Sequence, residues 1–150
     1  MSCSDISYRR GGATRAQILE HLEECDADFS PPLHTYADLP DYSAKIAGRA
    51  VTFEAWSGGV LAGLVAAYLN DPEGRAGFIT NVSVLRGFAR RGIASRLVAD
   101  ALDFARAGGF ETVSLEVEST NGAAVGLYEK LGFERAEGGD GRRVRMRVRL

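Results

Sequence analysis

Apolar and polar residues alternate along this chain with two different periods. Ile93, Leu97, Ala101 and Ala105 recur every fourth residue, and this spacing predicts an amphipathic helix over residues 93–107. In the tail, residues 143–150 alternate with a period of two, so that apolar residues face one side of a strand and arginines the other. A basic tail could also bind nucleic acid, but the alternation favours a solvent-facing strand surface.

The remaining elements follow from the same periods and from turn residues. Helices are expected over residues 14–25, 41–48 and 121–131, the first with Thr14 and Gln17 as a capping box. An irregular segment is expected at 26–39 and a hairpin turn at 57–59. The expected strands are residues 3–9, 51–56, 60–69, 76–85, 112–117, 133–136 and 143–150. This order predicts one mixed α/β (α+β-like) domain over residues 1–150.

Composition restricts the class of protein. The 150 residues carry a net charge of −2, so no overall attraction to nucleic acid or to an anionic membrane is expected. The two cysteines, Cys3 and Cys25, have no His or Cys at ligand spacing, which predicts neither a disulfide framework nor a metal site. No apolar run approaches the roughly 18 residues of a membrane span. The first residues also lack the apolar core of a signal peptide, so a cytoplasmic protein is expected.

The turn within residues 82–95 is rich in Arg and Gly, and it joins an expected strand to the expected helix. A helix start offers backbone N–H groups without intrahelical partners, together with the positive end of the helix dipole. Arg86, Arg90 and Arg91 add positive charge, and Gly92 allows the backbone to approach a ligand closely. These features predict a site for a phosphate group.

Three interpretations of this turn compete. Residues 87–92 have the spacing of a nucleotide P-loop, but Ile93 and Ala94 follow where that loop needs Lys and Ser or Thr. A second interpretation is a plain turn with solvated arginines, although cations at a helix start oppose the helix dipole. The third is a site for the diphosphate of coenzyme A.

A resemblance to a known family favours the third interpretation. The run Arg91, Gly92, Ile93, Ala94 resembles the acetyl-CoA-binding motif Q/R-x-x-G-x-G/A of the GCN5-related N-acetyltransferases, with Ala89 standing where the family has Gln or Arg. Residues 115–133 are similar to the family pattern L-x-V-x-x-x-N-x-x-A-x-x-L-Y-x-x-x-G-F and agree with it at every marked position. The resemblance covers residues 51–150 well, whereas residues 1–50 match only in layout.

The resemblance implies the GNAT fold, a mixed and mostly antiparallel sheet of about seven strands flanked by four helices. It implies an acyltransferase that moves an acetyl group from acetyl-CoA, its co-substrate, to a primary amine of a small molecule or a peptide N-terminus, by direct attack and without a metal. The pantetheine arm is expected along a strand edge and the pyrophosphate on the backbone amides of the turn. The cofactor-binding positions expected in this way are Val82, Val84, Arg90, Arg91, Gly92, Ile93, Ala94, Ser95 and Asn121.

The resemblance also implies catalytic residues. Tyr128 matches the family tyrosine that donates a proton or a hydrogen bond to the leaving CoA thiolate. A phenol with a pKa of about 10 protonates a thiolate with a pKa of about 8.5 only with help from its surroundings. Glu116 matches the base of the enzymes that acetylate the N-terminal alanine of ribosomal proteins, and Glu54 and Glu118 are alternatives. Asn121 is expected to bind the CoA arm, to cap its own helix, or both.

The acceptor side is less specified by the sequence. Candidate lining residues are Phe29, His34, Tyr36, Trp56, Tyr68 and Asn81. His34 is also a candidate second base. No nucleic-acid or membrane partner is expected, and a homodimer stays open. The alternative function is a non-catalytic acetyl-CoA sensor or interaction module of the same fold, against which the retained Tyr128 argues.

Overall fold

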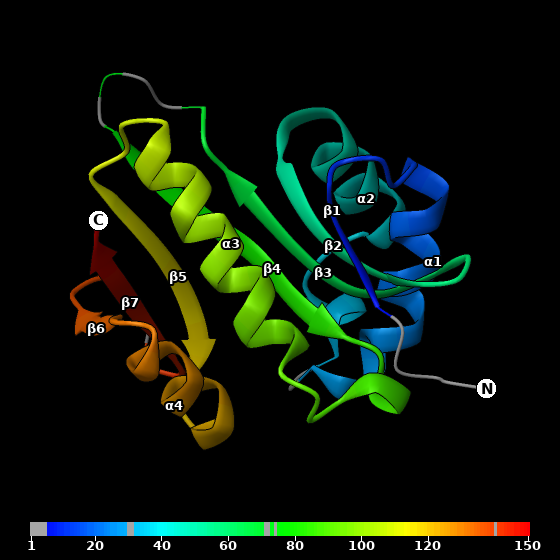
Figure 1. Ribbon diagram of the computed structural model, residues 1–150. Helices are drawn as coiled ribbons and strands as arrows, with labels where there is room; N and C mark the ends of the chain where they lie inside the picture. The colour runs from blue at the N-terminus through cyan, green and yellow to red at the C-terminus, as the bar shows by residue number, and fades with distance from the viewer. Residues whose placement is uncertain (1–5, 30–31, 71–72, 74, 140) are drawn as a thin grey trace.

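A seven-stranded sheet carries helices on both of its faces (Figure 1). This computed structural model describes residues 6–29, 32–70, 73, 75–139 and 141–150. The strands lie in the order β1-β2-β3-β4-β5-β7-β6, and among the described residues only β4 and β5 pair in parallel. Their bounds are β1 Ser7–Arg10, β2 Val51–Ser57, β3 Val60–Tyr68, β4 Ala76–Val84, β5 Thr112–Glu118, β6 Glu134–Ala136 and β7 Arg143–Arg149. The predicted mixed and mostly antiparallel sheet is confirmed.

The helices are α1 Arg15–Cys25, α2 Leu39–Arg49, α3 Ile93–Ala107 and α4 Gly122–Lys130, with short 3-10 turns η1 Asp26–Asp28, η2 Leu33–Thr35 and η3 Arg86–Phe88. Side chains cap the first N–H groups of α1, α2 and α4, whereas α3 begins at Gly92 without a side-chain cap. The predicted capping box is present, because Thr14 Oγ1 accepts from the Gln17 amide at 3.1 Å and Gln17 Oε1 accepts from the Thr14 amide at 2.9 Å. Helix α2 starts before the expected Asp41, because the Asp38 side chain caps it by accepting from the Asp41 amide.

The first strand has bounds that differ from the predicted residues 3–9. Strand β1 runs over Ser7–Arg10, so residue 6 precedes it and Arg10 extends it. Residues 3–5 of the predicted range, with Cys3, lie outside the described residues. The tail strand β7 confirms the alternation, since Met146 and Val148 are buried whereas Arg147 and Arg149 are exposed.

The core has two layers, one on each face of the sheet. On one face α3 and α4 pack on the sheet with side chains such as Leu97 and Val125. On the other face α1 and α2 contribute a second cluster, which includes Ile18 and Ile46. Because β3 is covered on both sides, its residues from 61 to 67 are all buried, whereas the edge strands β1 and β6 are mostly exposed.

Candidate active site

The candidate site lies where β4 and β5 separate. Among the described residues, their parallel pairing covers residues 76–78 of β4 against residues 112–114 of β5. Both strands continue, β4 to Val84 and β5 to Glu118, and Figure 1 shows them diverging towards these ends. The divergence opens a cavity of about 900 Å³. An open strand edge of this kind suits an extended ligand that contains amides.

The cavity has two walls of different chemistry, one on each face of the sheet. The α3–α4 wall is mostly apolar and consists of Val82, Val84, Ala94, Ala124, Leu127 and Tyr128. The α1–α2 wall is more polar and includes Cys25, Asp28, Phe29, Leu33, Tyr36, Tyr42, Thr80, Asn81, Ser83, Glu116, Glu118 and Arg143. Glu116 and Glu118 alternate with the core residues Leu115 and Val117 along β5, so they belong to the second wall.

The Arg and Gly turn differs in part from its expected form. The strand does not run straight into the helix, because η3 and a further turn separate Val84 from Ile93. Gly92 is the N-cap of α3 with a φ of 76°, and Arg90 also has a positive φ, of 65°. A Cβ on Gly92 would meet nothing within 4 Å, so open space lies beside the first turn of α3. A backbone turn of this shape ahead of a 15-residue helix suits an anionic group.

The expected cofactor positions divide into two groups. Val82, Val84, Ala94 and Asn121 line the cavity. The positions that are not among its lining residues are Arg90, Arg91, Gly92, Ile93 and Ser95.

Two of the turn arginines already have partners. Arg86 forms an ion pair with Asp28, and this pair reduces the negative charge that Asp28 presents to the cavity. The Arg91 guanidinium lies over the Phe88 ring at 5.3 Å from its centre. The side chain of Ile93 is in the core. Backbone amides of the turn are thus more available to a ligand than the side chains of these three residues.

Asn121 and Tyr128 belong to the same short helix, α4. Asn121 caps it, because its Oδ1 accepts from the Ala124 amide at 3.2 Å, which confirms the expected capping role. The Tyr128 ring is 6% exposed and meets Phe133 edge to face at 5.7 Å between ring centres. Burial raises the pKa of Tyr128 to about 12, so its hydroxyl stays protonated and can donate a hydrogen bond in the cavity at neutral pH.

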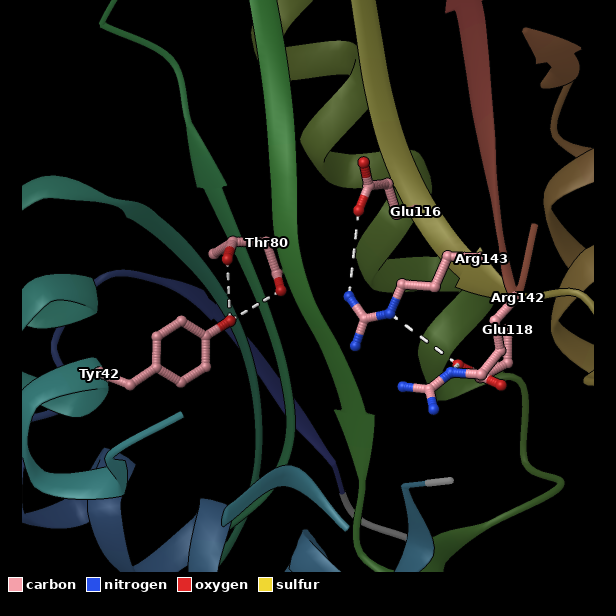
Figure 2. Close-up of polar contacts among 6 residues, drawn as sticks. All are labelled: Tyr42, Thr80, Glu116, Glu118, Arg142 and Arg143. Atoms are coloured by element: carbon pink, nitrogen blue, oxygen red, sulfur yellow. Dashed lines mark hydrogen bonds and ion pairs between the residues drawn. The ribbon is translucent and has the colours of Figure 1, made fainter. Parts of the chain in front are cut away.

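Charged side chains from β5 and β7 meet at the rim of the α1–α2 wall (Figure 2). Arg143 Nη1 lies 3.9 Å from Glu116 Oε1, and Arg143 Nε lies 3.9 Å from Glu118 Oε2. Arg142 Nε is 3.3 Å from the same Glu118 oxygen. That oxygen is buried, and it accepts no hydrogen bond from the described residues although two arginines lie at ion-pair distance. The Glu116 side chain is 32% exposed, so water can reach it.

Glu54, an alternative base, is a core residue. It is 0% exposed, and its carboxylate accepts from Thr52 Oγ1 at 2.6 Å, from Trp56 Nε1 at 2.9 Å and from the Ala13 amide at 3.2 Å. Neither Glu54 nor Trp56 lines the cavity. These two residues satisfy one another inside the sheet, so the interpretation of Trp56 as an acceptor-site residue has no structural support.

The other acceptor candidates also divide. Phe29, Tyr36 and Asn81 line the cavity, whereas His34 and Tyr68 do not. His34 Nδ1 lies 2.6 Å from a carboxylate oxygen of its neighbour Asp26, at the surface. Desolvation raises the pKa of Asp26, but the backbone hydrogen bond from His34 and this side-chain contact together hold that pKa below its usual value.

Two features of the α1–α2 wall escaped the sequence analysis. The register of β3 against β4 shifts so that Thr80 has no partner, which makes it the extra residue of a β-bulge. Tyr42 OH donates to the Thr80 carbonyl at 2.7 Å and lies 2.9 Å from its hydroxyl (Figure 2). Burial raises the pKa of Tyr42 to about 12. The second feature is His21, which is buried in α1 and hydrogen-bonded to the cavity residue Ser83.

The chain matches one family model over most of its length. The model described as "Acetyltransferase (GNAT) family" matches residues 15–133. This chain belongs to the GNAT acetyltransferase family, which confirms the resemblance seen in its two sequence blocks.

Relatives and solved structures agree with this assignment. N-alpha-acetyltransferase MAK3 of Arabidopsis thaliana is 43% identical over 61 residues, which are 41% of this chain and 32% of that protein. The uncharacterized N-acetyltransferase YsnE of Bacillus subtilis is 33% identical over 123 residues, 80% of this chain and 78% of that protein. The PaiA N-acetyltransferase of Thermoplasma acidophilum, solved in complex with coenzyme A, has a TM-score of 0.75 at 12% identity and covers 96% of this chain and 99% of its own. This chain thus spans about a third of the MAK3 relative.

Three further observations concern partners and redox state. Within the described ranges, no helix is long and apolar enough to cross a membrane. The same ranges contain no group of three His, Cys, Asp or Glu side chains that could hold a metal ion. Cys25 has a free thiol, and burial raises its pKa to about 12, which keeps it protonated and unreactive at neutral pH.

Proposed function

We propose that this chain transfers an acetyl group from acetyl-CoA to a primary amine by direct attack. The observation that carries the proposal is the cavity between β4 and β5, which has a buried tyrosine, Tyr128, on one wall and a carboxylate, Glu116, on the other. Membership of the GNAT family and relatives named as N-acetyltransferases support the activity. The coenzyme A in the PaiA structure supports the donor, and the N-alpha specificity in the MAK3 name makes a peptide N-terminus a leading acceptor.

The donor would bind along the α3–α4 wall. The pantetheine amides would pair with the open edge of β4 near Val82 and Val84, because an extended amide chain can extend a strand. The diphosphate would bind the amides of residues 90–95, where the positive φ of Gly92 leaves open space beside the helix start. Asn121 lies at the end of the same wall, where it caps α4 and can contact the arm.

Each catalytic residue would act on a different atom. Glu116 would take a proton from the acceptor ammonium and pass it to water, since its side chain is partly exposed. Tyr128 would donate a hydrogen bond to the sulfur as the C–S bond breaks, and its proton moves to the thiolate as that charge develops.

A panel of amines tests the activity directly. Purified protein is mixed with acetyl-CoA and with α-amino peptides, amino sugars, polyamines or lysine peptides, and free thiol is measured. We expect thiol release with at least one class of acceptor, and we expect acetyl-CoA to raise the melting temperature. A melting shift without thiol release for any amine would favour the sensor function instead. Neither a shift nor thiol would contradict both.

A further inference from the structure

A buried hydrogen-bonded chain connects α1 to the cavity. His21 is 2% exposed, and its Nδ1 lies 2.8 Å from the carbonyl oxygen of Leu61. Its Nε2 lies 2.9 Å from Ser83 Oγ, and Ser83 Oγ lies 2.7 Å from the side-chain oxygen of Asn81. Ser83 and Asn81 both line the cavity. The titratable ring of His21 is thus separated only by the Ser83 hydroxyl from the cavity in which the acceptor would bind.

The partners of His21 determine where its protons lie. A carbonyl oxygen only accepts, so Nδ1 carries a hydrogen and donates it to Leu61. In the neutral ring Nε2 is then an acceptor that faces Ser83 Oγ, with Cys25 Sγ farther away at 3.7 Å. Burial lowers the pKa of His21 against the raising effect of these two hydrogen bonds, which keeps the ring neutral at pH 7.

The hydroxyl of Ser83 has one hydrogen for two neighbours. When it donates to His21 Nε2, the ring is neutral and the Asn81 oxygen accepts no hydrogen from Ser83. When it donates to the Asn81 oxygen, Nε2 must carry the hydrogen and the ring is an imidazolium. The Ser83 hydroxyl can therefore turn between these two acceptors, and a proton can enter or leave the ring while the three side chains keep their places.

The chemistry of amide formation requires two protons to leave the acceptor nitrogen. An ammonium loses the first before it attacks, and the nitrogen loses the second after the N–C bond has formed. Glu116 accounts for the first of these under the proposed function. We propose that Ser83 and His21 take the second: the nitrogen N–H bond breaks as a Ser83 O–H bond forms, while the former Ser83 hydrogen moves to His21 Nε2. The proton returns through Ser83 to water when the product leaves, and the proton that Tyr128 gives to sulfur is replaced from water.

This role rests on the proposed function and adds a residue to it. His21 does not touch the substrate, so it is a positioning and proton-accepting residue that acts through Ser83. The described groups that face the ring are Cys25 from α1, Leu61 from β3 and Ser83 from β4, with Asp28 beyond Cys25. None of the three direct neighbours is charged at neutral pH, so protonation of the ring is governed mainly by burial.

The experiment compares four variants in the thiol-release assay. Ser83→Ala removes the hydroxyl that lies between His21 and the cavity, and Ser83→Thr restores a hydroxyl there. His21→Asn keeps an N–H near the Nδ1 position but has no nitrogen at the Nε2 position. Ser43→Ala is the matched control, because Ser43 is also a buried serine and its Oγ has no hydrogen-bond partner among the described residues. We expect kcat to fall about 10- to 100-fold in Ser83→Ala and His21→Asn, with the KM for acetyl-CoA unchanged, and to recover in Ser83→Thr.

The pH dependence distinguishes this role from a structural one. In the unsubstituted protein kcat should fall on the acid side, below the ordinary histidine pKa of about 6.5 because burial lowers the pKa of His21, since a protonated ring cannot accept another proton. That acid limb should be absent from both Ser83→Ala and His21→Asn. If Ser83→Ala and His21→Asn fold, bind acetyl-CoA and keep kcat within twofold, the proton transfer through Ser83 to His21 is overturned and the proposed function stays intact. Failure of the unsubstituted protein to release thiol with any amine would overturn the proposed function, and with it the proton transfer through Ser83 to His21.

Discussion

At the scale of single residues, Tyr128 combines burial with a place on the cavity wall. Its raised pKa, about 12, means that the hydroxyl is a donor over the whole neutral range. Tyr128→Phe removes this donor and keeps the ring contact with Phe133. We expect turnover to fall about 10- to 1,000-fold with little change in acetyl-CoA affinity, measured by steady-state kinetics and by titration of the ligand.

The matched control for this prediction is Tyr8→Phe. Tyr8 lies on β1, outside the cavity, where it stacks against Arg96. Loss of its hydroxyl should leave turnover unchanged within about twofold. Equal turnover in Tyr128→Phe and in the unsubstituted protein would remove Tyr128 from the mechanism.

His21 also links stability to pH. Its pKa is below 6.5 in the folded state because of burial, and close to 6.5 in the unfolded chain. Above that value both states have a neutral ring, and the full stability is present. As pH falls below about 6.5, the unfolded chain binds a proton that the folded state disfavours, so stability decreases. The urea midpoint of unfolding should therefore change more between pH 7.5 and pH 5.5 in the unsubstituted protein than in His21→Asn. The same change in both proteins would show that His21 does not contribute to the pH dependence of stability.

At the scale of elements, the turn before α3 depends on one glycine conformation. Gly92 has a φ of 76°, which side-chain-bearing residues reach at a cost of about 1 kcal/mol. Gly92→Ala should lower the free energy of unfolding by about that amount and weaken acetyl-CoA binding, because the new methyl group enters the open space beside the helix start. Gly87→Ala in the same turn is the control, since a Cβ there also meets nothing within 4 Å and the residue has no positive φ. Equal affinities in the two variants would contradict a diphosphate site here.

The elements themselves were largely predictable because their signals are local. The four-residue period of α3, the hairpin turn at 57–59 and the cap at Thr14 each arise within a few residues. The wall of the cavity was less predictable because its contacts are distant in sequence. Arg86 pairs with Asp28 from the segment after α1, and His21 reaches Ser83 across 62 positions. The bulge at Thr80 contains no glycine or proline that would mark it, so only the register of β3 against β4 reveals it.

At the scale of the whole molecule, the sheet is closed at one end of the β4–β5 pair and open at the other. Residues 76–78 and 112–114 pair with one another, whereas the later parts of both strands border the cavity. A pantetheine arm bound there would give hydrogen-bond partners to amides on the open edges, and amides already paired would gain none. We therefore expect acetyl-CoA to slow hydrogen exchange in residues 79–84 and in the amides of residues 90–95, with residues 76–78 and 112–114 unchanged. Uniform slowing of hydrogen exchange over the whole sheet would indicate general stabilisation by a ligand bound elsewhere. Only a ligand inserted between β4 and β5 protects the amides at the open end and leaves those at the paired end unchanged.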